Sequence, residues 1–382
     1  MEQERSTRQK QGIFLKGKMD LGFLALVMIL LVFGLIMLFS ASYPYAYAYM
    51  NNSYHFIIRQ ASIAIVGVVL MLLVSKINAH VYKKFAWIVY FISTALLVLL
   101  LILPIQIKGM DVKRWLVLGP ISFQPSEIAK FSIILLFATY ISKNYSKMKN
   151  FKEGIVIPGL LLAVICALVL VEPHLSATAL IFIIGAALMI FGGIKWKYVI
   201  GAAGIGVIGI IGAIVTGVIS YGSSRITYWL NPWADATGKG YQTIQSLLAI
   251  GSGGIMGRGF GQSHQKYLWL PEPHNDFIFA VVCEELGLIG ALALVILFCL
   301  LLWRGFVIAM RAPDKYSALL AAGLTFQVGL QAALNILVVT NTLPNTGISL
   351  PFFSYGGTAL LLLLVQMGIV LAISRTSNLE KS

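Results

Sequence analysis

Residues 20–42 read DLGFLALVMILLVFGLIMLFSAS, and this stretch decides the class of fold. Its only charged residue, Asp20, stands at the start, and the apolar run that follows is long enough for a helix to cross a hydrocarbon core of about 30 Å. The run is too long for the apolar part of a cleaved signal peptide, and more runs of the same kind follow it. Residues 20–42 are therefore predicted to form the first of several membrane-spanning helices.

The rest of the chain repeats this pattern. Of its 382 residues, 59% are hydrophobic and only 11% are charged, which is unusual for a soluble domain. We predict an all-α polytopic integral membrane protein with about ten spanning helices, at roughly 20–42, 55–75, 81–103, 124–142, 154–171, 175–193, 198–220, 275–302, 315–340 and 352–374. They form one membrane domain, residues 20–374, between short tails at 1–19 and 375–382. The longest connection, 221–274, joins the seventh and eighth spans.

The Lys and Arg residues orient the chain. If the N-terminus is cytoplasmic, 19 of the 28 basic residues fall in the tails and connections on that side, as the positive-inside rule requires. Both termini are thus predicted to be cytoplasmic, and 221–274 extracytoplasmic. The basic residues alternate with the spans and form no single solvated patch, so the net charge of +14 does not indicate nucleic-acid binding.

Several cations lie on the outer side, where the positive-inside bias does not account for them. These are Arg59, Lys113, Arg114 and Lys130. Anchoring at lipid headgroups would explain a single arginine here. Together, however, arginine forks and lysine point charges are the usual means of holding phosphate or pyrophosphate. We interpret the group as favouring an anionic ligand.

Glu127 and Lys130 are predicted to share one face of the fourth span. Glu127 follows Pro125 at a helix start, where capping alone would explain a carboxylate. Capping does not explain Lys130, which lies nearly one turn inside the membrane, where an ammonium group is costly unless it is paired or faces water. We therefore interpret the two as a functional pair.

Asp276 is predicted to open the eighth span. A helix-capping aspartate is the structural alternative, but an ionisable group at the mouth of a spanning helix is a functional candidate. Glu284 and Glu285 lie about 12–13 Å further along the helix, so neither can flank one scissile bond together with Asp276. A hydrolase pair within this helix is excluded.

Two other motifs have structural interpretations. The glycine-rich run 251–261 lies in a connection of an all-helical protein and lacks the strand that precedes a nucleotide-binding loop, so we predict a compact or mobile loop. His264 and His274 are too few and too loosely spaced for a zinc site.

Taken together, the motifs resemble the SEDS family of cell-wall glycosyltransferases, the FtsW, RodA and SpoVE proteins. The resemblance covers nearly the whole chain. The motifs that carry it are KRW at 113–115, QPSEIAK at 124–130, GYQ at 240–242, QSL at 245–247, QK at 265–266, LPE at 270–272, DFIFA at 276–280, EELG at 284–287 and GISLPFFSYGG at 347–357. The GYQ, QSL and QK motifs, with Ser263, look more like the division and sporulation branch than the elongation branch.

The resemblance implies a polymerase that joins lipid II units into β-1,4-linked glycan strands at the outer face of the bacterial cytoplasmic membrane. Transfer inverts the anomeric centre and releases undecaprenyl pyrophosphate. The resemblance further implies a divalent cation, Mg²⁺ or Mn²⁺, a class B penicillin-binding protein as partner, and contacts with other division or sporulation proteins.

The family's essential aspartate matches Asp276, as general base or as cation ligand, and the sequence leaves both roles open. The implied substrate-binding residues are Arg59, Lys113, Arg114, Glu127, Lys130, Lys266 and Ser354, and the candidate metal ligands are Asp276 and Glu127.

This chain departs from the family pattern in two places. Residues 172–176 read EPHLS where the family usually has QPDLG, and Asn275 replaces a usual threonine. These departures put in doubt a role for the turn between the fifth and sixth spans, but not the role of Asp276.

Other functions remain open on the sequence. A lipid II flippase would need polar groups along a path through the bilayer, whereas here they crowd the outer third of the spans, which favours the enzyme. An elongation-type polymerase is a further alternative, and a scaffold for other division proteins is compatible with the enzyme.

Overall fold

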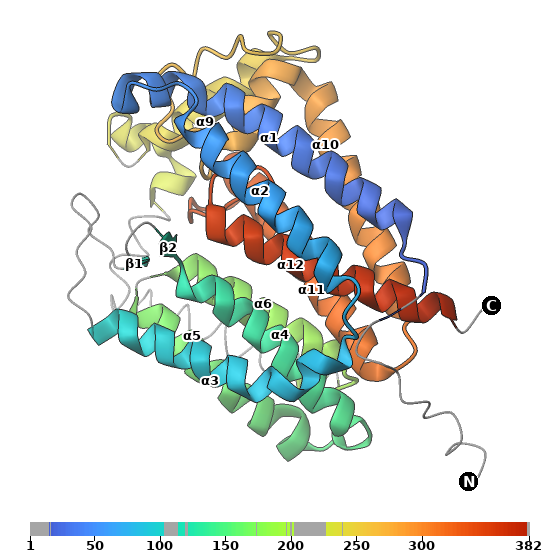
Figure 1. The fold of residues 1–382 in the computed structure, drawn as a ribbon. Coiled ribbons are helices and arrows are strands. Elements are labelled where there is room, and N and C mark those ends of the chain that lie inside the picture. Colours follow the sequence, from blue (N-terminus) through green and yellow to red (C-terminus); the bar gives the residue numbers. More distant parts are fainter. Residues whose placement is uncertain are drawn as a thin grey trace, which may run out of the picture.

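The computed structural model describes Leu15 and residues 17–102, 114–118, 121–172, 174–195, 197–198, 201, 227–238 and 240–379. This part of the chain is a bundle of long helices, with irregular segments and one short helix gathered at one end (Figure 1).

Nine long helices in the described part of the chain overlap nine of the ten predicted spans. They are α1 (Leu21–Met50), α2 (His55–Val74), α3 (His80–Ile102), α4 (Pro125–Lys143), α5 (Ile157–Val171), α6 (Leu175–Phe191), α10 (Ile278–Met310), α11 (Lys315–Val339) and α12 (Gly357–Leu379). A 3₁₀ turn, η1 (Tyr145–Lys147), follows α4, and a π turn, η2 (Lys152–Val156), leads into α5.

Seven of the described helices are long and apolar enough to cross a membrane, with η2 and α5 counted as one segment, and α6 is a shorter apolar helix. The chain is therefore a multi-pass membrane protein. The seventh predicted span, 198–220, lies outside the described residues except at positions 198 and 201. The count of ten and the orientation of the termini stay predictions.

The packing places α4, α11 and α12 in the interior. α4 contacts α3, α6 and α11, while α12 lies along α2, and α10 packs against α1 and α11. α11 and α12 have the largest buried share among the spans. Polar side chains on these interior helices are therefore kept away from lipid and can line an internal site.

Two polar contacts mark the two ends of the bundle. Asp20, which caps α1, pairs with Arg304 of α10 at 2.9 Å, and its backbone N–H donates to Ser374 of α12. About 30 Å away along α1, Ser40 donates to Glu285 of α10. Because the apolar core of a bilayer is also about 30 Å thick, the two contacts lie near its two boundaries.

The fold class is all-α as predicted, and the described residues add one short hairpin to the helices. β1 (Leu116–Leu118) and β2 (Ile121–Phe123) pair antiparallel, with Leu116 opposite Phe123, just before α4. Arg114 precedes the hairpin and Gln124 follows it, so the antiparallel pairing brings the two residues to the same end of the hairpin.

The predicted connection 221–274 contains secondary structure in its described residues. It contains η3 (Pro232–Asp235) and a helix, α9 (Tyr241–Gly253), which packs against α10. α9 ends because Gly254 takes a positive φ of 55°, a conformation that glycine adopts without strain. At 13 residues it is too short to span a bilayer.

The start of α10 corrects the interpretation of Asp276 as a possible cap. α10 begins at Ile278 with Phe277 as its N-cap residue, and no side chain makes a capping hydrogen bond there. Asp276 lies in the turn before the helix, so capping does not account for it.

Candidate active site

A cavity of about 1130 Å³ opens between α2, α4, α11 and α12, at the end of the bundle where α10 begins. Residues from six separate segments line it. Six of the eight predicted site residues are among them: Arg59, Arg114, Glu127, Lys130, Asp276 and Ser354. The tertiary structure therefore gathers most of the predicted site in one place.

Glu127 and Lys130 form the ion pair that their spacing predicted. Lys130 Nζ lies 2.8 Å from Glu127 Oε1, and the lysine side chain is almost completely buried. The ammonium group also donates to Gln331 Oε1 of α11 at 3.2 Å. Gln331 in turn donates to the backbone and hydroxyl oxygens of Ser349, both at 3.1 Å. The pair thus ties α4 to α11 and to the loop before α12.

Asp276 is held through its backbone rather than its side chain. Asn335 Nδ2 of α11 donates to Asp276 O at 2.7 Å and to Ile348 O at 2.6 Å. Gly347 lies against the carboxylate, since a Cβ atom there would be 3.1 Å from Asp276 Oδ2. The carboxylate is left facing the cavity that Asp276 lines.

The surroundings of Asp276 change its acidity. Burial and, less strongly, the negative charge of Glu272 raise the pKa of its carboxyl group, the positive charge of Arg114 lowers it, and the resulting pKa is about 6. At neutral pH the carboxylate is mostly ionised, and its basicity exceeds that of an ordinary aspartate.

Ser354 lines the cavity, but its hydroxyl is used to join two loops. Its Oγ donates to Asn275 O at 2.6 Å and accepts from Leu350 N–H at 2.7 Å. The neighbouring Tyr355 N–H donates to His274 O at 2.9 Å. These bonds fix residues 274–276 against the loop before α12.

The turn between α5 and α6, whose role the sequence left in doubt, reaches the cavity. His174 and Ser176 line it, and a ring nitrogen of His174 lies 3.2 Å from Gln124 Nε2. Glu172 is buried beside them. Burial raises its pKa to about 8 against the opposing positive charge of Arg114, so Glu172 is mostly protonated at neutral pH.

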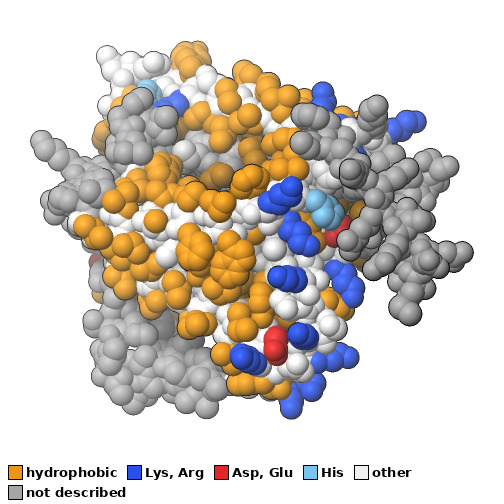
Figure 2. Space-filling model, turned by 60° about the horizontal axis from the view of Figure 1, so that its bottom comes forward, with side chains coloured by type: hydrophobic (Ala, Val, Ile, Leu, Met, Phe, Trp, Pro, Cys, Tyr) orange, Lys and Arg blue, Asp and Glu red, His pale blue; other side chains and the backbone are white. Residues whose placement is uncertain are grey.

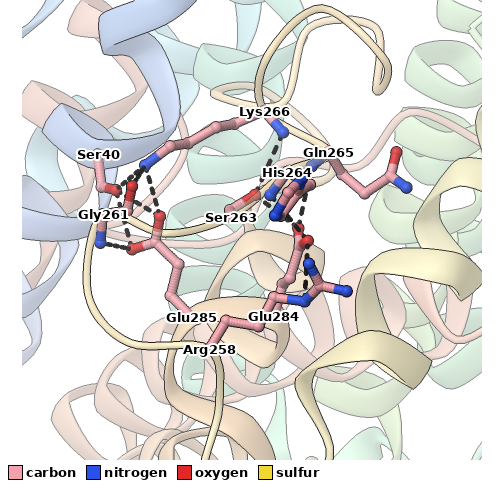
Figure 3. Close-up of polar contacts among 9 residues, drawn as sticks. All are labelled: Ser40, Arg258, Gly261, Ser263, His264, Gln265, Lys266, Glu284 and Glu285. Atoms are coloured by element: carbon pink, nitrogen blue, oxygen red, sulfur yellow. Dashed lines mark hydrogen bonds and ion pairs between the residues drawn. The ribbon is translucent and has the colours of Figure 1, made fainter.

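Lys266 does not line the cavity, which corrects its predicted placement. Its Nζ lies 2.8 Å from Glu285 Oε1 and also donates to Ser40 Oγ at 3.0 Å and Gly261 O at 2.7 Å (Figure 3). The ammonium and the Glu285 carboxylate are both buried. This ion pair joins α1, α10 and the loop after α9. Lys113, also predicted, lies outside the described residues.

Glu284 fastens the same loop from a second side (Figure 3). Its carboxylate accepts from Ser263 Oγ at 2.5 Å and from the backbone N–H groups of His264 at 2.9 Å and Gln265 at 3.3 Å. The loop also packs on residues 284–287 of α10, where the helix is broken and Gly287 has a φ of 66°. The glycine-rich run is thus compact, one of the two possibilities predicted. Glu284 and Glu285 bind this loop and do not line the cavity at Asp276.

Sequence reasoning missed Gln331 and Asn335. Both are buried amides in the second half of α11. An amide inside a span must find hydrogen-bond partners, so their presence in an apolar run was a signal. It did not reveal that those partners are the Lys130 ammonium and the Asp276 backbone.

The side chains that could bind a metal ion limit where the predicted Mg²⁺ or Mn²⁺ can be held. In the described residues, no group of three or more His, Cys, Asp or Glu side chains could hold a metal ion. Glu127 is engaged by the Lys130 ammonium, and Asp276 faces the cavity. A single carboxylate such as that of Asp276 is sufficient for Mg²⁺, because this ion is commonly held by one or two carboxylates together with phosphates of a substrate.

The comparison with known proteins agrees with this geometry. The family model of FtsW, RodA and SpoVE, described as "Cell cycle protein", matches residues 21–379. The chain belongs to this family. The resemblance predicted from the motifs is thereby confirmed.

Individual members of the FtsW/RodA/SpoVE family match over nearly their whole length. The chain is 38% identical to stage V sporulation protein E of Bacillus subtilis (strain 168), over 94% of this chain and 98% of that protein. It is 36% identical to the probable peptidoglycan glycosyltransferase FtsW of Geobacter sp. (strain M18), over 93% and 96%.

Solved structures of this family share the fold. A chain of a peptidoglycan synthase complex that coordinates polymerization and crosslinking superposes with a TM-score of 0.77 at 28% identity, covering 94% of this chain and 98% of that chain. The rod shape determining protein RodA of Thermus thermophilus gives a TM-score of 0.67 at 26% identity, covering 94% and 97%.

Proposed function

We propose that this protein is a peptidoglycan glycosyltransferase that polymerises lipid II in the cavity at Asp276, in cell division or sporulation. The observation that carries the proposal is the composition of the cavity. It presents one carboxylate of raised basicity, Asp276, together with the cations Arg59, Arg114 and Lys130. A glycosyl transfer that displaces a pyrophosphate needs this combination.

The carboxylate supplies the base. A sugar hydroxyl of one lipid II attacks the anomeric carbon of another, a new C–O bond forms, and the bond from that carbon to the pyrophosphate oxygen breaks. The hydroxyl proton passes to the Asp276 carboxylate. A positioned base contributes typically about 10²–10⁴-fold to such a step. Attack from the face opposite the leaving group inverts the anomeric centre.

The cations supply the site for the leaving group. The departing pyrophosphate is a stable anion and needs no proton, only positive charge that is already in place. Arg59 and Arg114 line the cavity with forked guanidinium groups suited to its oxygens. Lys130 makes its contacts with Glu127 and Gln331. We assign the arginines to the pyrophosphate and the Glu127–Lys130 pair to the shape and charge of the cavity floor.

A divalent cation and a protein partner are part of the same proposal. Mg²⁺ or Mn²⁺ would neutralise charge on the leaving group, and Asp276 would hold it together with the substrate's phosphates as the alternative to its role as base. A class B penicillin-binding protein is the proposed partner, by likeness to the synthase complex. We also propose that the membrane is the bacterial cytoplasmic membrane and that the cavity opens on its outer face.

Replacement of Asp276 tests the proposal most directly. An asparagine side chain has nearly the same size and shape as aspartate. Purified Asp276→Asn protein should therefore fold and bind lipid II but polymerise it at least about a hundredfold more slowly. Asp235→Asn, which changes an acid of η3 that does not line the cavity, is the control and should be active. Substantial glycan synthesis by Asp276→Asn would exclude both the base and the cation-ligand role. Transport of lipid II by a polymerisation-dead protein would instead favour the flippase.

A further inference from the structure

The turn that follows α9, residues 254–257, is joined to α10 at the break around Gly287. Leu288 N–H donates to Gly254 O at 2.9 Å, and Ile289 N–H donates to Ile255 O at 3.3 Å. A helix that starts anew after a break leaves its first N–H groups without acceptors in the helix, and the turn supplies two of these acceptors. The turn 254–257 is thereby held at the level of residues 288–289.

This position along α10 fixes the depth of the turn. Arg304, whose pair with Asp20 lies near one boundary of the bilayer's apolar core, follows Leu288 by 16 residues, or about 24 Å of helix. Because the apolar core is about 30 Å thick, Leu288 and the turn bound to it lie about 6 Å inside the other boundary. Any tilt of α10 places them deeper.

The turn presents apolar side chains at this depth. Ile255 is 65% exposed and Met256 is 79% exposed, and neither lines the cavity at Asp276. They stand beside Leu288 and Ile289, which are also exposed. Figure 2 shows the pattern expected of a lipid-facing surface on one face of the bundle, where an apolar area ends at a border of Lys and Arg side chains. Exposed apolar side chains inside these boundaries meet acyl chains, not water.

The backbone of the turn suits the same surroundings. Irregular backbone within the apolar core is tolerated only where its polar groups are bonded inside the protein. As the chain leaves the turn, Arg258 N–H donates to Glu284 O at 2.9 Å and Gly259 N–H donates to Glu285 O at 3.0 Å. A Cβ atom on Gly257 would collide with the Glu285 carbonyl oxygen, so the close approach requires glycine. This gives the glycine-rich run a physical reason.

Later residues of the same loop lie at the boundary itself. Lys266 binds Glu285 near the edge of the apolar core. Tyr267 and Trp269 follow, and both are exposed. Tyrosine and tryptophan are enriched where acyl chains meet headgroups. The loop therefore passes from the acyl layer at 255–256 to the interface at 267–269.

A spanning helix of another protein is the alternative cover for this turn. Interfaces between spanning helices are enriched in small residues and in side chains that form hydrogen bonds across the interface. The side chains that the turn exposes, Ile255 and Met256, are large and have no hydrogen-bonding group. Acyl chains need only an apolar surface, so they fit the turn better.

We propose that the turn 254–257 is a re-entrant membrane anchor, which inserts Ile255 and Met256 among the acyl chains of the nearest leaflet. The loop after α9 is then part of the membrane domain, held in lipid at one end and bound to α10 by Glu284 and Glu285 at the other. The anchor does not depend on the function proposed for the cavity at Asp276.

Thiol labelling of the purified full chain in lipid nanodiscs tests the proposal. Met256→Cys and Gln262→Cys are made separately in a chain whose three cysteines are replaced by alanine. Gln262, exposed in the same loop, is the matched control. With a membrane-impermeant reagent, Met256→Cys should react at least about tenfold more slowly, because reaction requires withdrawal of an apolar segment from lipid into water. Equal rates would overturn the proposal.

Fluorescence quenching measures the depth independently. A fluorophore on Met256→Cys should be quenched more by a nitroxide on the lipid acyl chain than by one on the headgroup, and a fluorophore on Gln262→Cys should show the reverse. Ile255→Cys serves if Met256→Cys does not fold. Stronger quenching of the anchor position from the headgroup would overturn the proposal. Protection in cells together with rapid labelling in nanodiscs would mean that another protein covers the turn, and would exclude lipid as its occupant.

Discussion

The amide of Asn335 holds Asp276 in place, with Nδ2 2.7 Å from the Asp276 carbonyl oxygen. The same nitrogen donates to Ile348 O at 2.6 Å, so one buried side chain of α11 joins the turn before α10 to the loop before α12. The position of the Asp276 carboxylate in the cavity thus depends on a helix more than 50 residues further along the chain.

Asn335→Ala should therefore lower turnover while the protein still folds. The change removes two buried hydrogen bonds and leaves two carbonyl oxygens unsatisfied, at a cost of about 1–3 kcal/mol each. We expect kcat to fall at least about tenfold with little change in KM for lipid II, because the base moves but the cations do not. Thr325→Ala, buried on the same helix outside the cavity, is the control. Equal kcat in both variants would contradict a positioning role for Asn335.

The pH dependence of kcat/KM should report the ionisation of Asp276, because kcat/KM reflects the free enzyme. A base must be deprotonated to act, and this carboxyl has a pKa of about 6, so activity should fall as the pH drops below about 6. Removing the negative charge in Glu272→Gln should lower the pKa and move this acidic limb to lower pH. Removing the positive charge in Arg114→Gln should move it to higher pH. Shifts in the same direction in both variants would contradict this electrostatic account.

The Glu127–Lys130 pair should contribute to activity beyond its effect on stability. Glu127→Gln leaves the almost fully buried Lys130 ammonium without its carboxylate, which typically costs about 3–5 kcal/mol. The double variant Glu127→Gln/Lys130→Met removes both charges and should recover most of the stability, as seen in its melting temperature. We expect the double variant to polymerise lipid II at least about tenfold more slowly than wild type. Near wild-type rates would make the pair purely structural.

Lys266 should matter for stability and not for substrate affinity. Lys266→Met leaves the buried Glu285 carboxylate without its ammonium partner, a loss of about 3–5 kcal/mol that should appear as a lower melting temperature. Lys266→Met/Glu285→Gln should recover part of it. KM for lipid II in the folded fraction should be unchanged. A large rise in KM in a well-folded variant would restore the prediction that Lys266 contacts the substrate.

Cysteine labelling from outside the cell tests the orientation. Single cysteines are introduced after Cys166, Cys283 and Cys299 are replaced by alanine. Gln262→Cys, exposed in the loop after α9, should react with a membrane-impermeant thiol reagent, and Ser146→Cys, exposed in η1, should be protected. Ser263 is unsuitable because it is buried against Glu284. The opposite pattern would invert the topology and place the cavity on the cytoplasmic side.

The sequence by itself predicted nine spans that the described structure contains and six residues that line the cavity. An apolar run of about 20 residues has a helix as its stable state in lipid, since every backbone polar group must be satisfied within the segment. Stretches such as 20–42 therefore fixed the helices locally. In the same way, a lysine nearly one turn inside a span needs a partner nearby, and Glu127, three residues before Lys130, was visible in the sequence.

Only the tertiary structure decided which distant polar groups meet. Lys130 also binds Gln331, and Asp276 is held by Asn335, across 201 and 59 residues of sequence. The sequence placed Lys266 in the substrate site, whereas packing directs it to Glu285 and Ser40. A buried charge must find a counter-charge because its desolvation is costly, so the sequence shows that a partner exists. Which partner it finds depends on how the helices pack, and that is set by contacts across the whole bundle.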